Sequence, residues 1–241
     1  MATPIQLFAT CLGDLIFPEA VADAERLLEA AGYEVVFSPQ QVCCGQPAFN
    51  AGHRNAARRV ARTFERAFSH EIPIVVPSGS CTTMVVHYLP ELLGCDPFAV
   101  HELSSFLDAA GGEPRRINEG RTVAYHDSCH MFRELGIADQ PRRLLERSGA
   151  AVVPLPRPDL CCGFGGTFSV RQPEISVAMA DDKLAGAARA QAEALVTADP
   201  GCLMHLRGRA EKAGGLPVVH LATALARGVG ASAAAPRADA S

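Results

Sequence analysis

Two pairs of adjacent cysteines are the most distinctive chemical feature of this sequence. Each pair is followed by glycine, in the string CCG at residues 43–45 and again at residues 161–163. Consecutive α-carbons lie about 3.8 Å apart, below the roughly 4.4–6.8 Å that a disulfide prefers. A disulfide within either pair would be strained, which favours metal binding as the role of the adjacent thiols.

The two pairs belong to a larger pattern that occurs twice. The SGSC string that ends at Cys81 recurs as DPGC ending at Cys202, and the apolar strings ERLLEAAG (25–32) and RRLLERSG (142–149) align as well. The sequence therefore indicates two similar halves with four candidate metal-ligating cysteines each. They are Cys11, Cys43, Cys44 and Cys81 in the first half, and Cys129, Cys161, Cys162 and Cys202 in the second. Cys95 has no counterpart and is expected to be a core residue or an incidental thiol.

Adjacent ligands suit a cluster of several metal atoms better than a single ion. Zinc sites normally separate paired ligands by two or more residues, so that the chain can wrap around one ion. An iron-sulfur cluster has neighbouring iron atoms, each of which can take one of two adjacent thiolates. We therefore expect one or two iron-sulfur clusters of the 4Fe-4S type, with zinc as the alternative.

The elements that must position these cysteines follow an alternating pattern. Short β-branched runs predict strands at 5–9, 33–37, 72–77 and 98–100, and helical patterns occupy 18–31, 52–69, 82–89 and the residues from 101. Further strands are predicted at 122–125, 151–155, 194–197 and 217–219. This alternation predicts an α/β protein with two pseudo-repeated Rossmann-like halves, whose parallel sheets are flanked by helices.

Each repeated cysteine comes after a predicted strand. In open parallel sheets the loops at the carboxyl ends of the strands gather at one edge, where ligands bind. The four thiols of each half are therefore expected to meet there.

Glycine, proline and composition suggest the domain limits. We expect a first CCG repeat at 1–112, a glycine- and charge-containing linker at 113–120, a second repeat at 121–227 and a disordered tail at 228–241.

Other residues near the cysteines have a chemistry that suits an anionic centre. Four glycines could allow close approach of the backbone and donate amide hydrogen bonds to sulfur: Gly45, Gly163, Gly165 and Gly166. His126 and His130 flank Cys129 in HDSCH, and we expect them to hydrogen-bond the cluster or to carry a proton. His101 and His220 precede the last helix of each half and are expected to cap or pack rather than to bind metal.

Composition excludes some partners. The chain has 22 basic and 26 acidic residues and only two lysines, which argues against a nucleic-acid surface. The uncharged stretch at 72–90 contains three prolines and is a poor transmembrane segment, and no basic secretory n-region is present. We expect the protein to be cytoplasmic. Because that compartment is reducing, its nine cysteines indicate metal or redox chemistry rather than structural disulfides.

Several long strings resemble one family. FATCLGDLIFPE, QQVCCGQPAFNAG, YHDSCHMFRELGI and CCGFGGTFSV are similar to those of lactate utilization protein A, and the chain is identified as a member of that family. Its duplicated cysteine-rich CCG domains also resemble those of heterodisulfide reductase and of the glycolate oxidase iron-sulfur subunit. The broader CCG pattern ends in C-x-x-C, but Met84 and His205 occupy the last position here, so a fifth cysteine is missing from both halves.

The resemblance implies an iron-sulfur electron-transfer subunit of a cytoplasmic L-lactate dehydrogenase complex, which works with lactate utilization proteins B and C to oxidise L-lactate to pyruvate. No flavin, nicotinamide or catalytic motif is recognisable, so this chain is not expected to oxidise lactate alone. Two alternatives stay open: a non-redox assembly subunit stabilised by zinc, and thiol or disulfide chemistry like that of heterodisulfide reductase.

Overall fold

Two four-stranded parallel sheets form the framework of the protein. The computed structural model describes residues 2–111 and 114–230. The first sheet has the order β2 (Tyr33–Val36), β1 (Thr3–Leu7), β3 (Ile74–Val76) and β4 (Val100–Glu102). The second has the order β6 (Ala151–Val153), β5 (Thr122–Tyr125), β7 (Ala194–Thr197) and β8 (Val218–His220). The equal orders, with every pair parallel, confirm the expected α/β fold of two repeated halves.

Helices connect the strands in both halves. The first half contains α1 (Cys11–Ile16), α2 (Pro18–Ala30), α3 (Gln46–Asn50), α4 (Arg54–Ala67), α5 (Gly79–Thr83), a π-helical turn (Met84–Tyr88), α6 (Leu89–Leu93) and α7 (Leu103–Ala109). The second contains α8 (Cys129–Arg133), α9 (Asp139–Arg147), α10 (Thr167–Arg171), α11 (Pro173–Arg189), α12 (Pro200–Ala213) and α13 (Leu221–Arg227). Among the described residues, none of these helices is long and apolar enough to span a bilayer.

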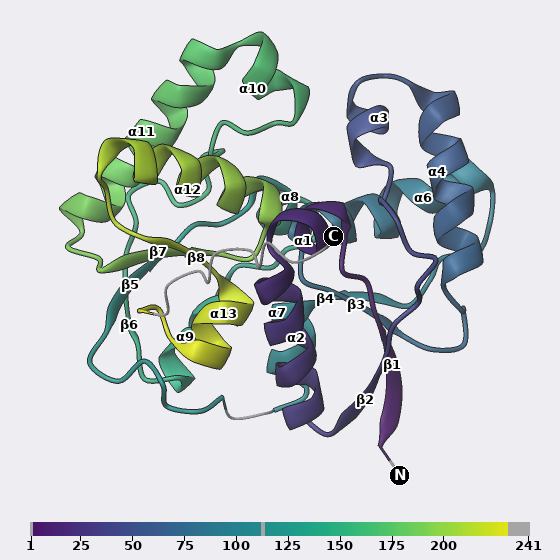
Figure 1. Ribbon diagram of the computed structural model, residues 1–241, viewed down its shortest axis with the longest axis horizontal. Coiled ribbons are helices and arrows are strands. Elements are labelled where there is room, and N and C mark those ends of the chain that lie inside the picture. Colours follow the sequence, from purple (N-terminus) through teal and green to yellow (C-terminus); the bar gives the residue numbers. More distant parts are fainter. Residues whose placement is uncertain (1, 112–113, 231–241) are drawn as a thin grey trace, which may run out of the picture.

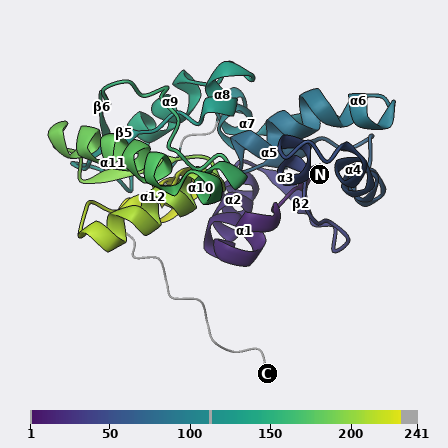
Figure 2. The ribbon, with the colours of Figure 1, turned by 90° about the horizontal axis from the view of Figure 1, so that it is seen from above.

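The halves share one apolar core. Helices α2, α7, α9 and α13 lie between the sheets in Figure 1, and the central core combines residues of the first half, such as Leu28 and Leu107, with residues of the second, such as Leu144 and Leu225. The outer face of the first sheet is covered by α4 and α6, and that of the second by α11 and α12. From above, the two halves lie side by side (Figure 2). Neither half buries its inner helices without the other.

The helix predicted at 82–89 is longer than expected. It begins at Gly79, because the Ser78 hydroxyl accepts a hydrogen bond from the Cys81 amide at 3.3 Å, and it continues to Leu93. Pro90 has no amide hydrogen and would interrupt a regular α-helix. The π-helical turn immediately before it changes the hydrogen-bond register, and the helix passes through the proline.

Other element boundaries differ by a few residues. The first strand is Thr3–Leu7 rather than 5–9, and β4 extends to Glu102, so α7 begins at Leu103 and not at 101. The Glu102 carboxylate accepts the amide hydrogens of Ser104 and Ser105 and fixes this helix start. Helices α1, α3, α8 and α10 were not predicted, because five or six residues are too few to show a helical period.

The segment between the halves is anchored to the second half. Asn118 is fully buried, and its amide nitrogen donates to the Ala224 carbonyl at 2.8 Å and to the Ser148 hydroxyl at 2.9 Å. Its carbonyl oxygen accepts from the Val229 amide at 2.9 Å, so packed structure continues to Val229. Residue 112 of the expected first repeat, residue 113 of the expected linker and residues 231–241 of the expected tail lie outside the described residues.

Candidate metal centre

All eight repeated cysteines line a single cavity of about 500 Å³. It lies beyond the carboxyl ends of the strands. Cys11 is the first residue of α1, directly after β1, and Cys81 lies in α5, directly after β3. Cys43 and Cys44 follow β2, and the second set is placed in the same way by β5, β6 and β7. The structure thus brings both sets to the sheet edge at which parallel α/β folds bind ligands.

Within each set the thiols lie in close pairs. The Sγ atoms of Cys11 and Cys43 are 3.6 Å apart, and those of Cys44 and Cys81 are 3.3 Å apart. In the second set the Sγ atoms of Cys162 and Cys202 are 3.3 Å apart. These separations exceed the roughly 2.05 Å of a disulfide bond, and all the cysteines are free thiols.

The thiols in each set perturb one another's ionisation. Hydrogen bonding from Cys11 lowers the pKa of Cys43, and hydrogen bonding to Cys43, with burial, raises the pKa of Cys11. Cys129 and Cys161 behave in the same way, and the pKa of Cys161 is lowered. One thiolate in each set is thus stabilised by protons that its neighbours retain. A bound cation would replace those protons, as metal ligation by thiolates requires.

Two of the predicted glycines turn the chain behind the cysteine pairs. Gly45 and Gly163 have φ angles of +90° and +95°, which L-residues rarely adopt. Their amides each lie 3.4 Å from a sulfur atom, that of Cys43 and that of Cys161 respectively. Such amide donors stabilise thiolate charge.

The remaining two predicted glycines, Gly165 and Gly166, line the cavity. The amide that lies 3.5 Å from the Cys162 sulfur belongs to Phe164, a residue that the sequence pattern did not single out. A backbone amide donor carries no sequence signal other than its position after CCG.

Asp199 ties the two cysteine sets together and was also missed. Its Oδ1 accepts the amide hydrogens of Gly201 and Cys202, at 3.0 and 3.3 Å. Its Oδ2 accepts the amide hydrogen of Ser80, which precedes Cys81 in the other half, at 2.7 Å. Aspartate before a proline and a glycine is a helix N-cap signal that could have identified it.

Both flanking histidines lie beside the second set. The His130 Nδ1 atom is 3.6 Å from the Cys129 sulfur, and its Nε2 atom is 3.5 Å from the amide nitrogen of Gln46 in the first half. His126 is fully buried, and one ring nitrogen, the Cys162 sulfur and the Cys202 sulfur all lie within 4.8 Å of one another. Burial lowers the pKa of His126 to about 3, so its imidazole is neutral and has a free lone pair.

The residues at the missing fifth position do not replace a cysteine ligand. Met84 is buried in the outer core of the first half. The His205 Nε2 atom lies 3.2 Å from both the hydroxyl and the carbonyl oxygen of Ser176. Neither residue lines the cavity; His126 is not a lining residue either, but unlike them it lies within 4.8 Å of two cysteine sulfurs.

The other chemically notable residues have structural positions. Cys95 packs against the outer core of the first half, away from the cavity lining. The His220 Nδ1 atom accepts the Ala222 amide hydrogen and so caps α13. His101 lies on β4, and its ring is 5.6 Å from that of Phe106.

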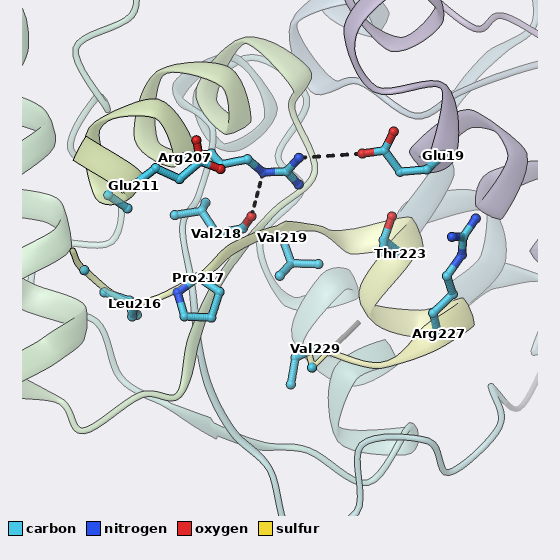
Figure 3. A pocket seen from close by; sticks show the side chains of 13 residues that line it. Glu19, Arg207, Glu211, Leu216, Pro217, Val218, Val219, Thr223, Arg227 and Val229 are labelled. Carbon is cyan, nitrogen blue, oxygen red and sulfur yellow. Dashed lines mark hydrogen bonds and ion pairs between the residues drawn. The ribbon is translucent and has the colours of Figure 1, made fainter. Parts of the chain in front are cut away.

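A second cavity of about 320 Å³ lies among α2, α12, β8 and α13 and contains no cysteine. Figure 3 shows Arg207 spanning it, with hydrogen bonds or ion pairs to the Val218 carbonyl and to Glu19. Both arginines that line this cavity are already paired, since Arg227 donates to the Asp23 carboxylate at 2.7 Å. We assign no chemistry to it.

Comparison with known proteins agrees with this geometry. A family model described as a cysteine-rich domain, CCG, matches residues 5–86 and 123–207. Lactate utilization protein A 2 of Bacillus cereus (strain Q1) is 39% identical over 238 residues, which cover 93% of this chain and 98% of that protein. The chain belongs to the lactate utilization protein A family.

A further relative and one solved structure support the assignment and the fold. Lactate utilization protein A of Geobacillus kaustophilus is 40% identical over 234 residues, covering 92% of this chain and 98% of the relative. A crystal structure of a hypothetical protein from Helicobacter pylori superposes with a TM-score of 0.61 at 9% identity, over 96% of this chain and 51% of that one. At that identity the likeness concerns the fold alone.

The donor set of this chain fits a metal centre. Each half gathers four free thiols, and sulfur ligands suit iron-sulfur clusters and zinc. The second half adds the buried imidazole of His126, whose ring nitrogens have no hydrogen-bond partner among the described residues. Clustered cysteines in a cysteine-rich domain indicate metal binding.

Proposed function

We propose that this protein is an iron-sulfur electron-transfer subunit of a cytoplasmic complex that oxidises L-lactate to pyruvate, together with lactate utilization proteins B and C. The observation that carries the proposal is that both four-cysteine sets open into one cavity. Iron-sulfur clusters, when bound, supply one-electron redox chemistry. Two such sites around one cavity would provide two neighbouring redox centres between which electrons could be transferred.

The chain's own residues are suited to holding redox centres. Cys44 and Cys162 are 1% and 2% exposed, so the thiolates at these positions would be shielded from water. Amide donors from Gly45, Gly163 and Phe164 approach the sulfur atoms, an arrangement that raises the reduction potential of iron-sulfur centres. Asp199 holds the two cysteine-bearing helices together.

Lactate oxidation itself requires other subunits in this proposal. Forming pyruvate removes two electrons and two protons from lactate, and the sequence shows no flavin or nicotinamide motif that would accept them together. The relatives' shared name, lactate utilization protein A, supports a multi-protein lactate system. Lactate-dependent reduction of the protein should therefore appear only when proteins B and C are present.

Metal analysis tests the proposal most directly. Protein purified without oxygen should contain several iron atoms per chain, matching acid-labile sulfide and a reducible electron paramagnetic resonance signal. Cys44→Ala and Cys162→Ala should each lose the metal of one half, whereas the matched control Cys95→Ala should retain all of it, because Cys95 is outside the cavity lining. Absence of iron and sulfide after anaerobic reconstitution would refute the proposal.

A second candidate, a zinc-stabilised assembly subunit, is favoured by one specific observation. Four sulfurs around one tetrahedral zinc, with bonds of about 2.3 Å, are separated by about 3.8 Å. The observed pairs at 3.3–3.6 Å approach that S–S separation, and the fifth position of the broader CCG pattern holds Met84 or His205 instead of cysteine. Stoichiometric zinc without sulfide would establish this candidate in place of the first.

A further inference from the structure

The two halves differ at the residue that directly follows their central strand. His126 follows β5 and Phe8 follows β1, and their backbones are held alike. The His126 amide donates to the Val196 carbonyl at 2.9 Å, and the Phe8 amide donates to the Val75 carbonyl at 3.0 Å. Phe8 packs in the outer aromatic core, where its ring centroid is 5.1 Å from that of Phe64. One repeat thus has an apolar ring where the other has an imidazole.

His126 has two unsatisfied ring nitrogens. The residue is fully buried, and within the described part of the chain neither Nδ1 nor Nε2 makes a hydrogen bond of normal length and angle, the Pro158 carbonyl being a weak acceptor beside the ring. A buried polar atom without a partner costs about 1–3 kcal/mol, and such atoms in native proteins call for an explanation. Cys162 and Cys202 offer their sulfur atoms within 4.8 Å of the imidazole. A metal held by these sulfurs would satisfy the imidazole as well.

Two other imidazoles near the second set are already engaged. The His130 Nε2 atom lies 3.7 Å from a Glu134 carboxylate oxygen and 3.5 Å from the Gln46 amide nitrogen. His205 lies against Ser176. His126 is therefore the imidazole near the second set that retains a free lone pair.

We propose that His126 supplies a nitrogen ligand to the metal held by the second cysteine set, which makes the two sites chemically unequal. The inference rests on the proposed function for the presence of metal, but it concerns which residues bind it. The first site has only thiolates, because Phe8 has no donor atom. The second offers a neutral imidazole beside its four thiolates, and it carries less negative charge when the imidazole takes the coordination position of one thiolate.

The inequality gives electron transfer a direction. When the His126 imidazole takes the position of one thiolate, the reduction potential of the second site rises, as it does when histidine replaces cysteine in an iron-sulfur centre. The second site is therefore reduced before the first. In a relay of the two, electrons would pass from a cluster held by Cys11, Cys43, Cys44 and Cys81 to one held by Cys129, Cys161, Cys162 and Cys202.

Nitrogen hyperfine spectroscopy tests this ligand directly. The full-length protein is purified without oxygen, with ¹⁵N introduced selectively into histidine, and its reduced metal signal is measured by pulsed electron paramagnetic resonance. We expect strong ¹⁵N coupling in wild type, in His130→Gln and in His205→Gln, and its loss in His126→Phe and His126→Gln. Phenylalanine is the residue of the first repeat at this position, and glutamine is the polar control.

The outcomes separate this inference from the proposed function. Strong coupling that persists in both His126 variants, or its absence from a wild type that contains iron and sulfide, overturns the ligand assignment. If the protein contains no iron or sulfide, the proposed function fails, and Co²⁺ added to metal-free wild type tests the ligand instead, through the same ¹⁵N coupling. If the His126 variants do not fold, the other two histidine variants decide. Loss of the wild-type ¹⁵N coupling in His130→Gln or His205→Gln overturns the assignment. Coupling that is retained in both of these variants supports it.

Discussion

Gly163→Ala should destabilise the protein much more than Gly45→Ala, although the two glycines occupy equivalent places in the repeat. Both have left-handed φ angles, +95° and +90°. An alanine in that region costs about 1–2 kcal/mol, partly offset by about 0.4–1 kcal/mol from the less flexible unfolded chain. This part of the effect should be the same at both positions.

The difference between the sites comes from their neighbours. A Cβ atom at residue 163 would lie 2.4 Å from the Ser176 carbonyl oxygen, a backbone atom of α11 that cannot rotate away. At residue 45 the nearest atom is the Ala57 carbonyl oxygen, at 3.4 Å. Overpacking typically costs about 1–3 kcal/mol. We therefore expect Gly163→Ala to be less stable than Gly45→Ala by about 1–3 kcal/mol.

Urea denaturation of the reduced, metal-free variants, followed by circular dichroism, measures this difference without contributions from metal. Gly52→Ala is a matched control, because Gly52 has a φ of +81° and a Cβ atom added there would have no neighbour within 4 Å. It should resemble Gly45→Ala. Equal stabilities for the Gly45 and Gly163 variants, within about 0.5 kcal/mol, would refute the steric argument.

Three further predictions follow from buried polar groups. Asp199→Ala should lower the free energy of unfolding by about 3 kcal/mol or more, since it leaves buried amide hydrogens unpaired in both halves, and urea denaturation measures this. Arg142→Met should cost about 3 kcal/mol in the same assay, because Arg142 pairs with the buried Asp127 at 2.8 Å, and the double variant with Asp127→Asn should recover part of the loss. Burial raises the pKa of Glu102 from 4.5 to about 7, so its stabilising contribution is present below pH 4.5 and is lost as the pH rises through 7. Glu102→Gln should abolish this loss, on the order of 3 kcal/mol, in unfolding curves recorded between about pH 4 and pH 8, and an unchanged pH dependence would contradict the assignment.

The repeated pattern of the cysteines made the main architecture predictable. The shared spacing located the equivalent loops of both halves, and the alternation of strands and helices implied parallel sheets. The structure then placed all eight cysteines around one cavity. Sequence reasoning treated each half by itself and did not foresee that the sets share this space, because helix packing between the halves determines their relative position.

The remaining misses have three different causes. Asp199 serves a helix of the first half as well as its own, a role that depends on three-dimensional proximity. The difference between Phe8 and His126 was present in the sequence, but its meaning required the unpartnered state of the buried imidazole. The π-helical turn before Pro90 could not be read from residue periodicity, because proline normally indicates a helix end.

The shared central core has a consequence for synthesis of the protein on the ribosome. Helices α2 and α7 are made early, yet the helices that pack on them, α9 and α13, begin 30 and 112 residues after the end of α7. At a translation rate of about 5–20 residues per second, roughly 6–24 seconds pass between synthesis of α7 and synthesis of α13. During that interval the apolar helices and reactive thiols of the first half are exposed together. The nascent chain therefore needs protection of this apolar surface until α13 has been made.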